Sequence, residues 1–178
     1  MSFSKGESSY YDLFHKDKDY KKEALKIKKM FPKAVTVLEI GCGTGNMTVE
    51  LEKLGFDVLG IDPSKGMLKK FKGKKSVWCT LEGLSYPKKK YDLVLALYDV
   101  LNYIPEFETA LNKMSRLGNQ VYYEVWPDQP VKLYMYKRIG KYKRIRLGFK
   151  FESEAYLWYI YWGKGLVVDF HKLYLHET

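Results

Sequence analysis

The 178-residue chain is poor in cysteine, histidine and proline. Its two cysteines and three histidines are too few for a disulfide framework or a metal site, so we expect no metal and a reducing environment. The longest uninterrupted apolar stretch, residues 155–162, is far shorter than the ~20 residues that span a bilayer. Residues 1–10, with Ser, Lys and Glu, lack the pattern of a signal peptide. These absences predict a cytoplasmic protein without a membrane partner.

The composition is that of a folded protein with an excess of basic residues. Hydrophobic residues make up 46% and charged residues 29%, and the length suits one domain with a real core. Lysine and arginine number 31 against 21 acidic residues, a formal net charge of +10. Such a charge attracts polyanions, acidic substrates or anionic membranes. The net charge does not indicate which of these partners the protein binds. It is equally compatible with basic residues that only interact with water.

Strand-like and helix-like segments alternate along the first two thirds of the chain. Residues 91–97 (YDLVLAL) form the most hydrophobic segment, which is typical of a central strand buried on both faces. Alternation at this spacing predicts an α/β fold with an open, mostly parallel sheet and helices on both faces. The expected strands are 35–40, 57–61, 77–80, 91–97 and 120–126. The expected helices are 20–31, 47–54, 64–73 and 105–117.

The last fifth of the chain changes its periodicity. Apolar and charged residues alternate over 144–152, which indicates an antiparallel strand with one wet face. Two further apolar segments, 155–162 and 166–175, flank the turn sequence Gly-Lys-Gly at 163–165. We therefore expect one domain over 1–178. It comprises an N-terminal lid and helix (1–34), a ligand-binding core (35–126), and a substrate-side helix with antiparallel hairpins as a C-terminal β appendage (127–178).

Residues 39–45 (EIGCGTG) lie between the first expected strand and the next helix. Glycines at alternate positions let the backbone turn tightly and approach a ligand, and in open α/β sheets ligands bind at this edge. Asp62 follows the second strand, where a carboxylate can take both hydroxyls of a ribose. A dinucleotide fingerprint would need a third glycine at Asn46. Glu39 would repel a pyrophosphate and attract an ammonium group, so the preferred ligand is a nucleoside that carries a positive charge. The alternative is a glycine turn that serves only packing.

Residues 39–45 followed by 60–68 (GIDPSKGML) resemble the first two motifs of class I S-adenosylmethionine-dependent methyltransferases. The resemblance covers roughly residues 10–126. It implies a Rossmann-like sheet and S-adenosyl-L-methionine as cofactor, with Glu39 and the loop glycines near its methionine end and Asp62 on its ribose. Those glycines are Gly41, Gly43 and Gly45.

Two further parts of the resemblance concern the adenine and the N-terminal segment. Family members usually carry an acidic residue after the third strand, where this chain has Thr80; the backbone of Leu81 is a second contact. Glu82 is a substitute, or else an exposed loop carboxylate. Residues 10–14 (YYDLF) are similar to methyltransferases that act on sugars and other small metabolites, in which this segment folds over the cofactor. Tyr11 and Tyr20 are therefore lid candidates, with helix packing equally open for Tyr20.

Methyl transfer needs alignment of the acceptor's lone pair with the methyl carbon, and a base only when the acceptor must lose a proton. Candidate catalytic residues are Asp99 and Tyr98 at the end of the fourth strand and His171 in the last strand. Asp99 has the alternative role of capping the next turn, and a lone strand histidine is more often structural. Further polar candidates near these strand ends are Asn102, Tyr103, Glu124 and Trp126.

The predicted reaction is methyl transfer to N or O of a small molecule, such as a sugar or a nucleotide-linked metabolite. An RNA or protein methyltransferase that uses the basic clusters 69–75, 88–90 and 137–146 is the alternative, and nucleic acid is not favoured. A non-catalytic cofactor-binding protein is the third hypothesis, because the C-terminal appendage leaves no room for the family's last helix and strand. Completion by a second copy, as a homo-oligomer, stays open.

Overall fold

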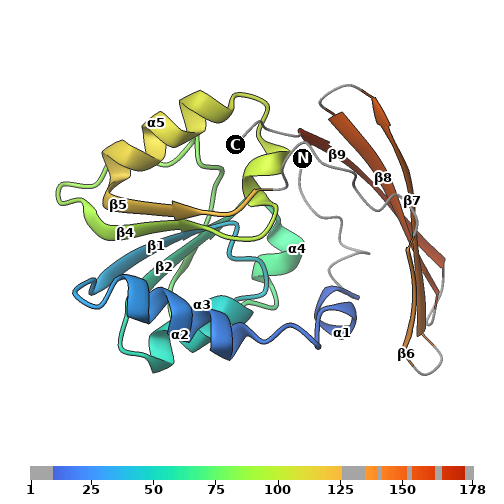
Figure 1. The fold of residues 1–178 in the computed structure, drawn as a ribbon, viewed down its shortest axis with the longest axis horizontal. Coiled ribbons are helices and arrows are strands. Elements are labelled where there is room, and N and C mark those ends of the chain that lie inside the picture. Colours follow the sequence, from blue (N-terminus) through green and yellow to red (C-terminus); the bar gives the residue numbers. More distant parts are fainter. Residues whose placement is uncertain (1–9, 126–134, 140–141, 152–153, 163–165, 175–178) are drawn as a thin grey trace.

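The computed structural model of the chain describes residues 10–125 and the backbone of 135–139, 142–151, 154–162 and 166–174 (Figure 1). Within this part of the chain, every helix is too short or too polar to cross a bilayer. The described residues form two sheets, one parallel and one antiparallel.

The first sheet has five strands in the order β3-β2-β1-β4-β5, and every neighbouring pair is parallel. The predicted open, mostly parallel sheet is therefore confirmed. β5 begins at Gly118 rather than at residue 120, because Gly118 ends the preceding helix in an extended conformation and passes directly into the strand. The strands are β1 (Thr36–Ile40), β2 (Asp57–Asp62), β3 (Ser76–Trp78), β4 (Tyr91–Ala96) and β5 (Gly118–Tyr123).

Helices cover both faces of this sheet (Figure 1). Two helices, α2 (Tyr20–Met30) and α3 (Asn46–Lys53), lie on one face, and α5 (Phe107–Leu117) lies on the other. Three short helices lie beyond the carboxyl ends of the strands: α1 (Tyr11–Phe14), α4 (Lys65–Leu68) and the 3-10 helix η2 (Val100–Tyr103). The predicted Rossmann-like arrangement of layers is thus observed.

Strand β4 shows how the sequence divides the core between the two faces. Leu93 and Leu95 are fully buried in the cluster that contains α2 and α3 side chains. Val94 and Ala96 alternate with them and belong to the cluster that contains α5 side chains. Because successive side chains of a strand point to opposite faces, an uninterrupted apolar run fits a strand that is covered twice.

The predicted boundaries of α2 and α3 differ from the observed ones by one residue, and larger differences occur in α4 and α5. The Ser64 hydroxyl caps α4 by accepting from the Met67 N–H at 3.3 Å, as expected, but this helix ends at Leu68 and not at residue 73. The chain turns there because Lys72 donates its backbone N–H to the Thr44 carbonyl at 3.1 Å, outside any helix. Helix α5 begins at Phe107 rather than at residue 105, so Pro105 precedes the helix.

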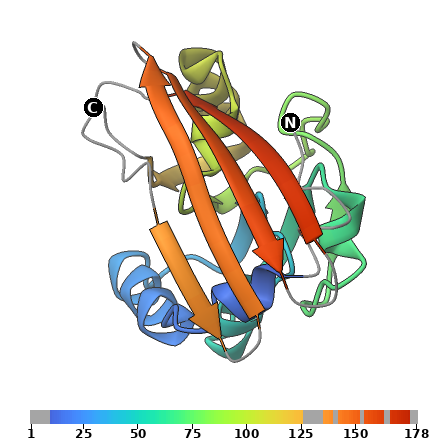
Figure 2. The same ribbon diagram turned by 90° about the vertical axis from the view of Figure 1, so that its right-hand side faces the viewer.

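The second sheet is antiparallel, with the order β6-β7-β8-β9. Figures 1 and 2 show it standing across the carboxyl ends of the parallel strands, where β6 contacts α1 and β9 contacts η2. All described residues after 125 lie in strands, whereas the predicted turn at 163–165 lies outside the described residues. The strands are β6 (Met135–Ile139), β7 (Tyr142–Phe151), β8 (Glu154–Trp162) and β9 (Leu166–Tyr174).

Candidate active site

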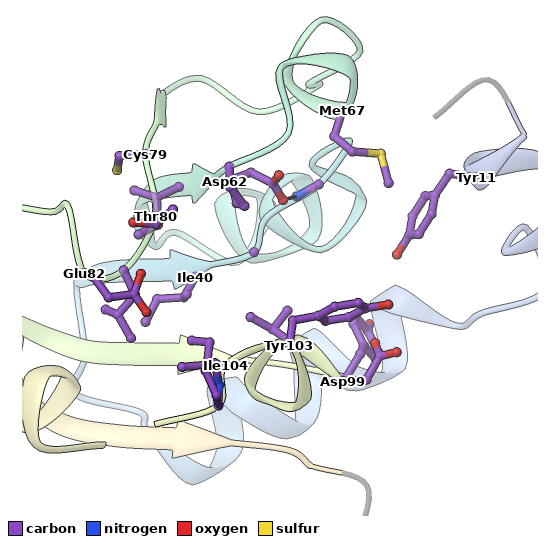
Figure 3. A pocket seen from close by; sticks show the side chains of 18 of the residues that line it. Tyr11, Ile40, Asp62, Met67, Cys79, Thr80, Glu82, Asp99, Tyr103 and Ile104 are labelled. Carbon is purple, nitrogen blue, oxygen red and sulfur yellow. Dashed lines mark hydrogen bonds between the residues drawn. The ribbon is translucent and has the colours of Figure 1, made fainter. Parts of the chain in front are cut away.

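A cavity of about 470 Å³ opens at the carboxyl ends of the parallel strands. Its walls come from α1, the end of β1 and the loop after it, the end of β2, α4, the loop after β3, the residues that follow β4, and η2. The volume lies within the range of small-molecule and cofactor sites. Figure 3 shows Tyr11, Asp99 and Tyr103 at one end, Thr80 and Glu82 at the other, and Asp62 between them.

Two glycines of the 39–45 loop line this cavity with a backbone that other residues rarely adopt. Gly41 has φ +70°, and a Cβ there would lie 2.4 Å from Cγ2 of Val100. Gly43 has φ +56°, and a Cβ there would meet no described atom within 4 Å, so its bare side is open space. Gly45 does not line this cavity and is the N-cap of α3. The loop therefore gives a ligand close access to backbone.

Asp62, at the end of β2, is buried and tied to two backbone segments. Its Oδ2 accepts from the Gly43 N–H at 2.9 Å, and its Oδ1 accepts from the Ser64 N–H at 2.7 Å. Burial raises the pKa of this carboxyl, although both hydrogen bonds oppose the shift. Each carboxylate oxygen keeps lone-pair capacity for one more donor. Asp62 thus fixes the glycine loop and can still accept hydrogen bonds from a ligand's hydroxyls.

Glu39, in β1, is a second buried carboxylate, with 4% of its surface exposed. Its Oε2 accepts from the Thr48 hydroxyl at 2.5 Å, the one hydrogen bond that its side chain makes within the described part of the chain. Burial, with a smaller contribution from the nearby Asp62, raises its pKa to about 7, although the hydrogen bond from Thr48 opposes the shift. A carboxylate desolvated in this way favours a cationic partner over an anionic one.

A smaller cavity of about 20 Å³, room for a single water, adjoins Glu39. It shares Tyr11, Gly41 and Tyr98 with the larger cavity, so the two are neighbours. The hydroxyls of Tyr20 and Tyr98 are buried, and neither forms a hydrogen bond of good geometry with a described atom, although the side chains of Asn46 and Glu23 lie near them. Buried unsatisfied polar atoms are uncommon and mark places that a ligand can complete.

Tyr98 has an unusual backbone as well as a hydroxyl that lacks a hydrogen bond of good geometry. It has φ +63°, the one non-glycine positive φ among the described residues, and its N–H donates to Oε2 of Glu124 at 3.2 Å. Such strain costs about 1–3 kcal/mol and clusters at functional sites. The Lys18 ammonium lies 3.6 Å from the Tyr98 ring centroid and also lines the cavity.

The end of the cavity beside β3 contains Thr80, Leu81 and Glu82. The Thr80 hydroxyl accepts from the Gly83 N–H at 3.1 Å, and Lys113 Nζ donates to the Glu82 carbonyl at 2.6 Å. These bonds hold the backbone of the turn. Leu81 is buried, whereas the side chains of Thr80 and Glu82 are exposed at the cavity rim.

The structure brings most of the predicted residues together at these two cavities. Tyr11, Asp99 and Tyr103 line the larger cavity, whereas Tyr20 and Glu39 line only the smaller one. Asn102 is fully buried and lines neither. His171 lies in β9, paired with Leu157, and its side chain and Trp126 lie outside the described residues.

Sequence reasoning missed two residues of the N-terminal segment that line the cavity. These are His15 and Lys18, which follow the predicted lid tyrosine in the chain. His15 Nδ1 donates to the Tyr11 carbonyl at 2.9 Å, and its ring lies 4.3 Å from that of Tyr11. The spacing of His15 from Tyr11, one helical turn, was the available signal, whereas Lys18 follows the end of α1 and has no such local signal.

Among the described residues, no cluster of acidic, histidine or cysteine side chains could hold a metal ion.

Comparison with known proteins agrees with this geometry. Residues 37–120 match the model of a family described as a methyltransferase domain. An uncharacterized methyltransferase of Alkaliphilus oremlandii is 45% identical over 64 residues, which are 34% of this chain and 30% of that protein. The curated relatives that match are covered over 30% to 52% of their length.

Two solved structures share the fold over nearly the whole chain. Streptomyces venezuelae DesVI has a TM-score of 0.79 and 20% identity, with 96% of this chain and 84% of that chain covered. CalS10 of Micromonospora echinaspora, an amino pentose methyltransferase solved with S-adenosylmethionine bound, has a TM-score of 0.74 and 16% identity, with 99% and 84% covered. Identities this low establish the fold alone. Residues 37–120 thus match a methyltransferase-domain family, and the chain has the fold of S-adenosylmethionine-dependent methyltransferases, in agreement with the resemblance predicted from the sequence.

Proposed function

We propose that this chain binds S-adenosylmethionine and transfers its methyl group to N or O of a small acceptor. The observation that carries the proposal is the position of two buried carboxylates. Glu39 borders the smaller cavity, and Asp62 lies in the wall of the larger one next to it. An ammonium group and a ribose diol are the groups that these two carboxylates would take.

The residues fit this cofactor along its whole length. Glu39 would hold the ammonium of the methionine end, and the open side of Gly43 leaves room for close approach to the backbone. Asp62 would accept from the ribose hydroxyls. Thr80 and the Leu81 backbone would contact the adenine at the far end of the cavity. When bound, S-adenosylmethionine supplies an electrophilic methyl group on a sulfonium.

The chain's own contribution to transfer is orientation and proton handling. Asp99 lines the same end of the cavity as Tyr11 and would hold or take the proton of the attacking N or O. Burial raises the pKa of Tyr98 far above its ordinary value, so its hydroxyl stays protonated and serves as a hydrogen-bond donor rather than a base. His171 stays a catalytic candidate, since its strand contacts η2 next to Asp99.

The size of the cavity supports a small acceptor. A volume of about 470 Å³ lies within the range of cofactor and small-molecule sites, which supports a compact acceptor rather than a macromolecule inside the cavity. The fold similarity to an amino pentose methyltransferase supports an acceptor of sugar type, alone or nucleotide-linked. We therefore propose a sugar-like amine or hydroxyl as the methyl acceptor.

The first test is calorimetric titration of S-adenosylmethionine, S-adenosylhomocysteine and NAD into the purified protein. We expect binding of the two sulfur nucleosides only. Asp62→Ala should weaken it at least tenfold, because a charged hydrogen bond to a ligand is worth about 1.5–3 kcal/mol. Asp57→Ala is the matched control, since Asp57 begins the same strand and pairs with Lys75 on the surface.

An acceptor screen by intact mass then follows, with aminosugars and nucleotide-linked sugars as probes. A mass gain of one methyl group on an acceptor supports the proposal. Absence of binding of either sulfur nucleoside to the folded wild-type protein would refute it. Equal losses of affinity in both variants would refute the role of Asp62.

A further inference from the structure

Helix α1 carries a side chain that closes both cavities. Tyr11 lines the larger and the smaller cavity, and Figure 3 shows its ring pointing into the larger one from α1. Its neighbours Tyr10 and Phe14 are buried, with 5% and 1% of their surface exposed. The helix has only four residues, so its own hydrogen bonds cannot hold it in place. Contacts to the rest of the protein must fix Tyr11.

Asp12, the residue after Tyr11, makes contacts that bridge three distant segments. Its Oδ1 accepts from the Thr44 hydroxyl at 2.6 Å and from the Asn46 side-chain amide at 2.9 Å. Its Oδ2 pairs with Lys72 Nζ at 2.7 Å. Thr44 belongs to the glycine loop, Asn46 begins α3, and Lys72 follows α4.

The partners of Asp12 are also joined to one another. Lys72 Nζ donates to the Asn46 side-chain carbonyl at 2.7 Å, and the Lys72 N–H donates to the Thr44 carbonyl at 3.1 Å. Thr44 is 1% exposed, so one end of the network is anchored in the core. Isolated surface ion pairs contribute little, but a network with pre-ordered partners loses less side-chain entropy per contact.

The charge of Asp12 is preserved by these contacts. Burial by itself would raise the pKa of this carboxyl, but the hydrogen bonds from Lys72, Thr44 and Asn46 bring it below its ordinary value. The carboxylate is therefore ionised near neutral pH and keeps its pairing with Lys72.

We propose that Asp12 is a positioning residue that fastens α1, and with it Tyr11, to the glycine loop and to Lys72. The proposal rests on the proposed function, because the cavities that Tyr11 closes are those assigned to S-adenosylmethionine. With Asp12 engaged, Tyr11 lies over the bound cofactor. Release of the cofactor requires these bonds to break together, so Asp12 sets the release rate and takes no part in the chemical step.

The test is the release rate of S-adenosylhomocysteine, measured with radiolabelled ligand and a chase of unlabelled ligand. We expect Asp12→Asn and Lys72→Met each to speed release about tenfold, the equivalent of one lost interaction of ~1.4 kcal/mol. The double variant should release the ligand less than a hundredfold faster, below the product of the two single effects, because both substitutions remove the contact between Asp12 and Lys72. Asp57→Asn is the control, since it breaks another exposed pair of 2.7 Å, with Lys75.

A second readout separates local opening from general destabilisation. In the ligand complex, amide hydrogen exchange of residues 10–15 should rise in Asp12→Asn and Lys72→Met, with exchange in α5 unchanged. A rise across the whole chain, or an unchanged release rate in both variants, would overturn the role of Asp12. If Asp12→Asn does not fold, Lys72→Met decides alone, because its side chain is half-exposed.

The two proposals fail in different ways. If the wild-type protein binds S-adenosylhomocysteine and neither variant alters its release, the fastening role falls and the cofactor assignment stands. If the wild-type protein does not bind it at all, both fall.

Discussion

At the scale of single residues, the ionisation of Glu39 should make both the stability of the protein and its affinity for the cofactor depend on pH. Burial raises the pKa of Glu39 from 4.5 to about 7, so the folded protein binds this proton more tightly than the unfolded chain does. The contribution of this proton to the free energy of unfolding is fully present below about pH 4.5 and is lost as the pH rises through about 7. The ionised carboxylate therefore lowers the stability of the ligand-free protein, and a bound cation would offset this loss.

We predict that Glu39→Gln removes most of this pH dependence. The free energy of unfolding of the ligand-free wild-type protein should fall between pH 5 and pH 8, and that of the variant should fall by about 2–3 kcal/mol less. The measurement is urea unfolding at both pH values. Parallel curves for the two proteins would contradict the elevated pKa.

The same carboxylate predicts the pH dependence of cofactor binding. Wild-type affinity for S-adenosylhomocysteine should rise between pH 6 and pH 8, because the ionised Glu39 attracts the ammonium group. Glu39→Gln should bind at least tenfold more weakly at pH 8, the loss of about 1.5–3 kcal/mol expected for a charged hydrogen bond, and without this rise. Calorimetry at the two pH values measures both effects.

Substitution of Gly43 or Gly55 by alanine makes it possible to distinguish the effect of backbone strain from the effect of a side chain that blocks the site. Both have positive φ, +56° and +87°, and a Cβ at either would meet no described atom within 4 Å. Gly43 lines the larger cavity, whereas Gly55 follows α3 and lines neither cavity.

We therefore expect Gly43→Ala and Gly55→Ala to lose similar stability, about 1–2 kcal/mol each, the cost of a left-handed alanine. Only Gly43→Ala should lose affinity for S-adenosylhomocysteine. Thermal unfolding and calorimetry on the two variants give the comparison. Equal affinities would mean that the bare side of Gly43 does not face the ligand.

At the scale of elements, α5 covers one face of the parallel sheet through a narrow apolar stripe. Ala110, Met114 and Leu117 are its buried residues, and Met114 is fully buried. Truncation of such a side chain removes packing and leaves a cavity. Polar residues occupy the exposed positions between them.

We predict that Met114→Ala destabilises the protein by about 2–5 kcal/mol. Asn112→Ala, on the exposed side of the same helix, should change stability by less than about 0.5 kcal/mol. Urea unfolding measures both values. A small loss for Met114→Ala would mean that α5 packs loosely on the sheet.

Helix α4 shows where local signals stop deciding the boundaries of an element. Its start follows from Ser64, whose hydroxyl caps the first turn. Its end at Leu68 follows instead from the packing of the next residues against the glycine loop, where Lys72 bonds to Thr44. The helix propensity of residues 69–73 therefore cannot predict where α4 ends.

At the scale of the whole molecule, the net charge of +10 is the feature that the proposed reaction does not explain. Lysines at 88–90 and at 69, 70 and 74 are exposed on the described surface. Charges on a solvated surface bind phosphates without sequence preference and in a strongly salt-dependent way.

We expect binding to a generic single-stranded RNA to be non-specific. It should weaken by about tenfold or more between 50 and 200 mM salt, as for proteins that contact several phosphates. Affinity for S-adenosylhomocysteine should change little over the same range, because the carboxylates that would hold it, Glu39 and Asp62, are buried. Fluorescence anisotropy with two unrelated RNA sequences measures the first effect. Tight binding of one sequence at 200 mM salt would favour the RNA methyltransferase alternative.

The sequence alone determined the parallel sheet, its covered faces and the glycine loop with Asp62. Apolar periodicity and glycine conformation act over a few residues, so they can be read along the chain. Only the tertiary structure decided that Asp12 meets Lys72, that Lys18 lies on the Tyr98 ring and that Tyr98 adopts φ +63°. The two contacts join residues far apart in the chain, and the strained backbone of Tyr98 is held by the structure around it, so the packing of the whole domain determines all three.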